Sequence, residues 1–227
     1  MSYGLYLLLS FVGLGFALLA SFWTSSSFNR YRGTPTKRSI TPVQLAKEII
    51  EGENLNLSLE YTDGQLTDHY DPLRNIVRLG RETANTTGLS PLAVTAHEFG
   101  HALQDKQGGI LFKFRNMIAG LVGISTNIGY FLIMIGLVLS YFDLAQIGLV
   151  LFSATTIFMF ITLPIEFDAS RRGLALLKKY DVVSDYEYGA ARTVLTAAAL
   201  TYVAGFLQSL LQLVYFASLI SGRRRND

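Results

Sequence analysis

Two long apolar runs, separated by three residues, are the strongest indication of the fold. They read MIAGLVGISTNIGYFLIMIGLVLS at 117–140 and LAQIGLVLFSATTIFMFITLPI at 144–165, with YFD at 141–143 between them. Neither run contains Asp, Glu, Lys, Arg or His. About 20 such residues suffice for a helix to cross the hydrocarbon core of a bilayer. The segment therefore predicts two membrane-spanning helices joined by a tight hairpin.

Two more apolar runs, at 3–23 and 194–220, predict a first and a last span. A cleaved signal peptide is the alternative for 3–23. No Lys or Arg precedes Arg30, and the run is longer than the apolar part of a signal peptide, so we favour an uncleaved span. The run at 194–220 exceeds the thickness of a bilayer, which indicates tilt or an extension beyond it. We expect a mainly α multi-pass membrane protein with four transmembrane helices, surrounded by a lipid bilayer.

The basic residues indicate how the chain is oriented. Lys and Arg concentrate in the polar segments 24–115 and 166–193, whereas the loop at 141–143 has neither. Cytoplasmic loops of membrane proteins carry the excess of Lys and Arg, so both polar segments are predicted to face the cytoplasm. Arg223, Arg224 and Arg225 would then lie outside. Either this tail tolerates that position, or the last segment does not cross fully.

The composition limits the possible chemistry. A net charge of +2 gives no reason to expect a nucleic-acid partner, and nothing indicates a particular oligomeric state. The chain has no cysteine, so disulfides and thiolate metal ligands are excluded. A metal ion would have to be held by His, Asp or Glu, and the only histidines are His69, His97 and His101.

The first polar segment predicts a small β-sheet between two helices. One helix should begin at Thr41-Pro42 and end near Glu51, and the other should begin at Ser90-Pro91 and end near Gln107, before two glycines. Between them, alternating and β-branched residues favour three short strands. These strands are expected at 55–60, 65–69 and 76–79, with turns at Asp63-Gly64 and Asp71-Pro72.

The second of these helices carries the motif His97-Glu98-Phe99-Gly100-His101. Residues four apart lie on one face of a helix, so both imidazoles can reach one zinc ion. Glu98 is rotated away by about 100 degrees and suits a general base acting on a metal-bound water. Gly100 leaves room for another element to pack closely. The alternative, an idle polar pair, is disfavoured because the flanking residues are apolar and two of three histidines are used.

A catalytic zinc needs a third protein ligand. Glu166, in PIEFDASRR at 164–172, is predicted to emerge on the same side of the membrane as the motif. It is our candidate for that ligand, although an acid at this position also suits an interfacial anchor. His69 is the other candidate. A loop histidine is often only solvated, but His69 could bind substrate or stabilise the oxyanion, with Asp68 and Asp71 orienting it.

These motifs together resemble the membrane-bound neutral zinc metallopeptidases often called YugP-like. The resemblance covers the whole chain and is carried by TDHYDP at 67–72, AHEFGHALQ at 96–104 and LPIEFDASRR at 163–172. It implies a bacterial integral membrane peptidase with one zinc ion. A more distant similarity, to the Glu-x-x-Ala-Asp helix of CAAX-type membrane proteases, implies that Glu166 completes the zinc site. In those proteins the Asp supports a zinc histidine. Ser170 stands in its place and could do this only weakly, so Asp168 or another residue is expected to take over that role.

We therefore expect residues 1–227 to form a single membrane-embedded peptidase domain with a zincin-like catalytic region. Its substrates would be membrane or juxtamembrane proteins. An intramembrane protease of the site-two type is disfavoured because polar residues flank the motif on both sides. A third possibility is a non-catalytic scaffold, or a transporter-like protein, that retains the metal site. The spans lack the ionisable groups that transporters carry, which argues against the transporter.

Overall fold

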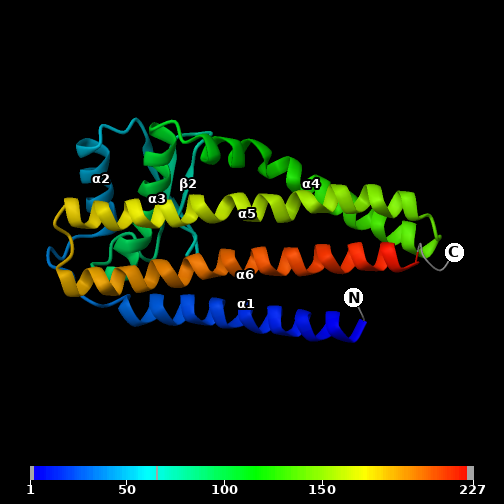
Figure 1. The fold of residues 1–227 in the computed structure, drawn as a ribbon. Coiled ribbons are helices and arrows are strands. Elements are labelled where there is room, and N and C mark those ends of the chain that lie inside the picture. The colour runs from blue at the N-terminus through cyan, green and yellow to red at the C-terminus, as the bar shows by residue number, and fades with distance from the viewer. Residues whose placement is uncertain (1–2, 65, 224–227) are drawn as a thin grey trace. The chain divides into compact units, whose positions relative to one another are not determined.

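A computed structural model describes residues 3–64 and 66–223, and within them the fold is mainly helical, as predicted (Figure 1). Six helices accompany one three-stranded sheet in this part of the chain. In chain order the elements are α1 (Tyr3–Tyr31), α2 (Pro42–Gly52), β1 (Ser58–Thr62), β2 (His69–Asp71), β3 (Ile76–Gly80), α3 (Leu89–Lys106), α4 (Ile110–Val138), α5 (Phe142–Lys179) and α6 (Asp185–Arg223).

Four of the described helices, α1, α4, α5 and α6, are long and apolar enough to cross a membrane, which confirms the predicted number of spans. Each helix is longer than the apolar run that predicted it. The helix α5, for example, continues unbroken through Pro164 to Lys179. A helix satisfies its backbone hydrogen bonds internally, so α5 can continue beyond its apolar run into polar residues. Arg224 and Arg225 of the basic tail lie outside the described residues.

The chain divides into two compact units. The apolar unit comprises residues 1–20, 114–164 and 201–227, and the polar unit comprises residues 21–113 and 165–200. Within the apolar unit, α4 and α5 approach so closely that a side chain at Gly129 would lie 2.6 Å from the backbone of Phe152. Small residues at such contacts are typical of helix packing in membranes.

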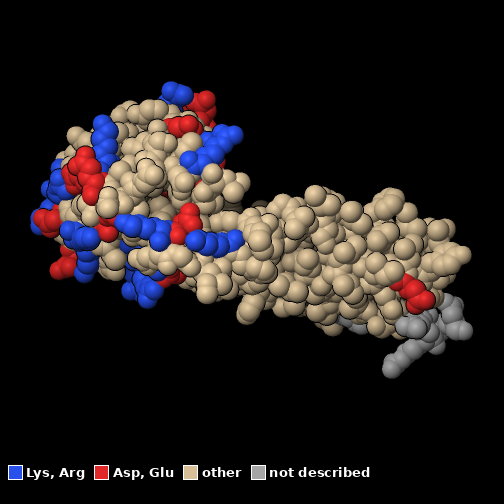
Figure 2. Space-filling model, turned by 90° about the horizontal axis from the view of Figure 1, so that it is seen from above, with Lys and Arg blue, Asp and Glu red and all other residues tan. Residues whose placement is uncertain are grey.

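The polar unit has a closed apolar core. Leu45 of α2, Val77 of β3, Phe99 of α3 and Leu177 of α5 are completely buried there. Figure 2 shows that the charged side chains on the face drawn gather over this unit, while the surface of the apolar unit is almost free of them. The polar unit is therefore organised like a water-soluble domain.

The helix starts were predicted with mixed success. Thr41 caps α2 as expected, with a reciprocal hydrogen-bond pair to Gln44, a motif that typically contributes about 1 kcal/mol. Ser90 was expected to cap α3, but that prediction was wrong. The helix begins at Leu89 after Gly88, and the Ser90 hydroxyl donates instead to the carbonyl of Phe28. The Ser90 side chain therefore forms a tertiary hydrogen bond instead of capping the helix.

The strands form a sheet in the order β1-β3-β2, with β1 parallel and β2 antiparallel to β3. The third strand lies where the sequence predicted it. The first begins at Ser58 instead of Leu55, because Leu55 and Leu57 pack against the core without pairing. The second covers 69–71 instead of 65–69, and Gln65 lies outside the described residues. Pairing with β3 sets both ranges, over a long sequence separation for β1 and within a local hairpin for β2.

Candidate metal centre

Three side chains that could hold a metal ion converge in the polar unit: His97 and His101 from α3, and Glu166 from α5. Their ligand atoms all lie within 4.8 Å of one another. The Oε2 atom of Glu166 is 3.4 Å from Nε2 of His97 and 3.6 Å from Nε2 of His101. Both imidazoles therefore direct the same nitrogen at one carboxylate oxygen.

Two glycines bring the backbones of α3 and α5 together at this point. A side chain at Gly100 would collide with the backbone carbonyl of Ala169, as its place in the motif predicted. A side chain at Gly173 would lie 2.9 Å from the backbone of Ala96 and His97. The contact is reciprocal, so neither helix can carry a larger residue there without separating from the other.

The orientation of His101 is set by a chain of hydrogen bonds. Its Nδ1 lies 3.0 Å from Oε1 of Gln104. The Gln104 amide nitrogen donates to the Ile165 carbonyl and to Oδ2 of Asp168, at 2.9 Å each. The amide oxygen must then accept, so His101 carries its proton on Nδ1 and leaves the Nε2 lone pair for a metal. Arg172 in turn fixes Asp168, at 2.5 Å.

His97 is oriented by a single hydroxyl. Its Nδ1 lies 3.1 Å from Oγ of Ser170. The sequence predicted a weak role for Ser170 and a supporting role for Asp168. The contacts agree with that division, since Asp168 reaches the other histidine, through Gln104. The sequence analysis missed Gln104. Its position three residues after His101, on a helix that is buried for most of its length, was the available signal.

Glu98 lies beside the three-residue cluster and is held by the sheet. Its Oε2 accepts a hydrogen bond of 2.9 Å from the backbone N–H of Tyr70 in β2. Burial raises the pKa of the Glu98 carboxyl, while His97 and His101 act in the opposite direction. A buried carboxyl beside the cluster, held by one oxygen, has the placement that a general base requires.

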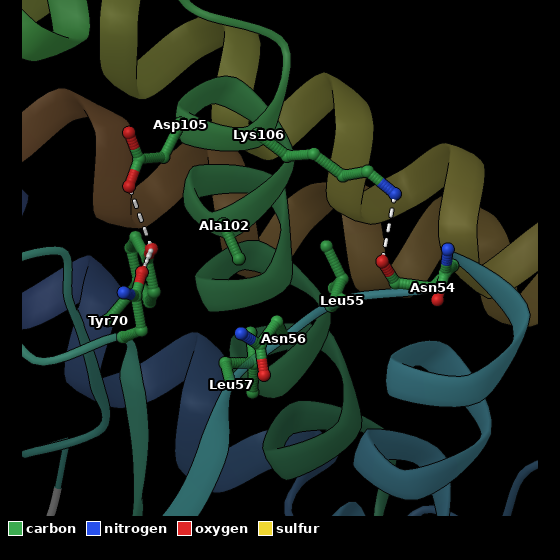
Figure 3. A pocket seen from close by; sticks show the side chains of 9 residues that line it. Asn54, Leu55, Asn56, Leu57, Tyr70, Ala102, Asp105 and Lys106 are labelled. Atoms are coloured by element: carbon green, nitrogen blue, oxygen red, sulfur yellow. Dashed lines mark hydrogen bonds between the residues drawn. The ribbon is translucent and has the colours of Figure 1, made fainter.

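Tyr70 links β2 to α3 through two hydrogen bonds at different positions along the helix. Its backbone N–H holds Glu98, and its hydroxyl donates to Oδ2 of Asp105, 2.9 Å away and two turns further along the helix (Figure 3). The same side chain borders a cavity of about 320 Å³, lined also by Ala102 and Asn56. Sequence reasoning selected its neighbour, His69. In a strand, adjacent residues face opposite sides, so the two cannot both face α3.

His69 lies on the other face of the sheet and is exposed. Its Nδ1 is 2.8 Å from the Thr67 carbonyl, and Arg78 donates to Nε2 at 3.1 Å, so Nδ1 is the donor and Nε2 the acceptor in these contacts. Arg78 also binds Asp71. Asp68 accepts a hydrogen bond from the N–H of Gly80 and interacts with His69 through charge rather than through a hydrogen bond. Among the described residues, the group that could hold a metal does not include His69.

The donor set at the cluster fits zinc. Two neutral imidazole nitrogens and one carboxylate oxygen are a common catalytic ligand set, and they leave a fourth position for water. Glu166 is 3% exposed and carries one negative charge, which offsets half the charge of a divalent ion in a poorly solvated place. The two Nδ1 atoms are engaged elsewhere, so the lone pairs on Nε2 remain for the metal.

Comparison with known proteins points to the same chemistry. A family model described as "Putative neutral zinc metallopeptidase" matches residues 6–221. "Putative membrane protease YugP" from Bacillus subtilis (strain 168) is 34% identical over 224 residues, a match that covers 98% of this chain and 100% of that protein. No solved structure matches the chain.

Proposed function

We propose that this chain, which belongs to the neutral zinc metallopeptidase family, is a membrane endopeptidase of the HExxH type. His97, His101 and Glu166 would hold one zinc ion, and Glu98 would act as general base. The observation that carries this proposal is the convergence of both Nε2 atoms on one buried oxygen of Glu166, a residue from a distant part of the chain.

When bound, zinc supplies a Lewis acid that lowers the pKa of water to about 7 and polarises a carbonyl. The residues of the chain would do the rest. Glu98 takes a proton from the attacking water and delivers it to the leaving amine. The Tyr70 N–H holds Oε2 of Glu98, which orients Oε1 for that transfer. Gln104 and Ser170 keep the two imidazoles in position.

The substrates we propose are peptide bonds in membrane or juxtamembrane proteins. Four apolar helices in the described chain would keep the enzyme in a bilayer, so proteins in or beside the bilayer are the ones it meets. We include His69 as a residue that binds substrate or stabilises the oxyanion, and we treat residues 1–227 as one functional peptidase domain.

The decisive test is Glu98→Gln in the full-length, membrane-reconstituted protein. We expect this variant to retain one zinc per chain and to lose activity by roughly 10²–10⁴-fold, the usual contribution of general acid–base catalysis. Elemental analysis and a peptide-cleavage assay supply the two readouts. Glu51→Gln is the matched control, because Glu51 is exposed on α2. Full turnover in Glu98→Gln would exclude the mechanism, and a wild type that holds zinc without cleaving peptides would favour a scaffold.

We also propose that the polar unit faces the cytoplasm, at the plasma membrane of a bacterium. The support is the distribution of Lys and Arg between the segments that join the apolar helices. Reporter fusions at Gly109 and Asp181 should both report the cytoplasm, and a fusion at Asp143 should report the opposite side. Opposite sides for Gly109 and Asp181 would be incompatible with Glu166 as a ligand of the α3 site.

A further inference from the structure

A second cavity in the polar unit lies between α5 and α6, and the proposed mechanism does not use it. Its volume is about 330 Å³. Phe167, Ser170 and Arg171 of α5 line it on one side, and Arg192, Leu195 and Ala199 of α6 line it on the other. The lining therefore combines two cationic groups with apolar surface.

The charge of this cavity is positive and largely uncompensated. Its lining includes two arginines and no acid. Arg171 pairs with Asp168, but Asp168 is shared with Arg172, so one positive charge remains in that group. No hydrogen bond or ion pair joins the side chain of Arg192 to another residue within 3–64 or 66–223. Two guanidinium groups on one cavity suit a phosphate, which each can bind through paired N–H donors.

The apolar part of the lining lies, along α5 and α6, close to the residues where the chain passes between the two units. Phe167 follows Pro164, the last residue of the apolar unit on α5, and Ala199 comes just before that unit resumes on α6. Both residues lie within roughly one helical turn of the position where the chain passes from one unit to the other, given 3.6 residues per turn. Phe167 is 49% exposed. An occupant with both a phosphate and hydrocarbon would contact both kinds of surface.

We propose that this cavity binds an anionic phospholipid, with its phosphate on Arg171 and Arg192 and the start of an acyl chain against Phe167, Leu195 and Ala199. Basic pockets between transmembrane helices are suited to anionic head groups. A free phosphate would use the two arginines but would gain nothing from the apolar residues. A zwitterionic lipid would use the apolar residues but would bring a cation toward the arginines.

The cavity adjoins the metal centre through one residue. Ser170 lines the cavity, and its hydroxyl contacts Nδ1 of His97. A bound lipid would restrict Ser170 and so hold His97 in its ligating orientation. This consequence, unlike lipid binding itself, rests on the proposed function. Zinc should bind more tightly, by a few-fold, in membranes that contain the anionic lipid.

Native mass spectrometry of the purified full-length protein tests the proposal without any need for activity. Phosphatidylglycerol and phosphatidylcholine with identical acyl chains are the probes. We expect the wild type to retain phosphatidylglycerol preferentially, and Arg192→Gln to weaken that binding about fivefold, the contribution of one cation near an anionic lipid. Arg192→Lys should restore most of the binding. Arg74→Gln, the same charge change at an exposed turn outside the cavity, is the control.

Three results would overturn the lipid site: equal retention of the two lipids, equal losses in Arg192→Gln and Arg74→Gln, or displacement of the lipid by millimolar inorganic phosphate. Zinc affinity in nanodiscs with and without phosphatidylglycerol tests the connection through Ser170. If lipid binding follows Arg192 but zinc affinity does not respond, the lipid site stands and its coupling to His97 does not. If no peptidase activity is found, the lipid result is unaffected.

Discussion

The two units use the same residue types in opposite ways. In the polar unit the large apolar side chains are inside, and Leu45 and Phe99 are completely buried. In the apolar unit Phe11 is 69% exposed and Val150 is 71% exposed. A monomer in water rarely exposes so much contiguous apolar surface. This difference indicates that the chain is folded for two solvents, water around one unit and hydrocarbon around the other.

Polar side chains differ between the units in the same sense. In the apolar unit, Thr126 and Ser153 donate to carbonyls of their own helices, at Val122 and Val150. This local bond satisfies a hydroxyl where no water is present. In the polar unit, Gln104 joins residues on two helices and holds a candidate metal ligand. Chemistry and anchoring should therefore be separable by mutation.

The largest effect is expected from the two histidines. His97→Ala and His101→Ala should each lose bound zinc and peptidase activity, because one imidazole and one carboxylate are too few ligands for a catalytic site. Both variants should still integrate into membranes, since the apolar unit is unchanged. Zinc content and extraction from carbonate-washed membranes provide the measurements. Stoichiometric zinc in either variant would place the metal elsewhere.

A smaller effect on zinc binding is expected from substituting the two acids on α5, Glu166 and Asp168, which lie in the polar unit. Glu166→Gln should weaken zinc binding more than 100-fold, because it removes a ligand and leaves the charge of the ion uncompensated. Asp168→Asn should weaken binding by only about 10–100-fold, as is typical of residues that orient a ligand. Titration with a competing chelator measures both. The reverse ranking would make Asp168 the ligand.

An intermediate effect, on membrane insertion, is expected from placing a charge on the exposed surface of the apolar unit. Val150→Arg in the apolar stretch of α5 should cost about 2.5–3.5 kcal/mol of apparent insertion free energy. Leu73→Arg is the matched change in the polar unit, where Leu73 is 93% exposed, and it should stay within about 0.5 kcal/mol of wild type. Glycosylation-based insertion assays would compare them. Equal costs would mean that the exposed apolar surface does not face lipid.

The smallest effect is expected at His69. Its ring lies on the exposed face of the sheet and contacts Thr67 and Arg78. His69→Ala should leave zinc in place and lower turnover by less than about tenfold, in the range of one lost hydrogen bond to a substrate. Steady-state kinetics with parallel zinc analysis would measure this. If His69→Ala lost the metal while Glu166→Gln retained it, His69 would be the third zinc ligand and Glu166 would not.

Sequence reasoning succeeded where one local signal decided the structure. Runs without charge predicted the four spans, and Thr41 with Pro42 predicted the start of α2, because each depends on neighbouring residues alone. It failed where a distant partner decided. Ser90 bonds to Phe28, and the start of β1 follows its pairing with β3. Gln104 and Tyr70 were missed for the same reason, since each matters through contacts with elements remote in the sequence.

The close helix contact at Gly100 and Gly173 determines when, during synthesis, the candidate metal centre can form. His97 and His101 leave the ribosome before α4 and α5, whereas Glu166 and Gly173 follow only after the apolar stretch of α5 is complete. The close contact of the two helices cannot form until then, so under the proposed assignment the nascent chain has two ligands and no third. A protease built in this order would stay inactive until three of its four candidate membrane helices have been synthesised.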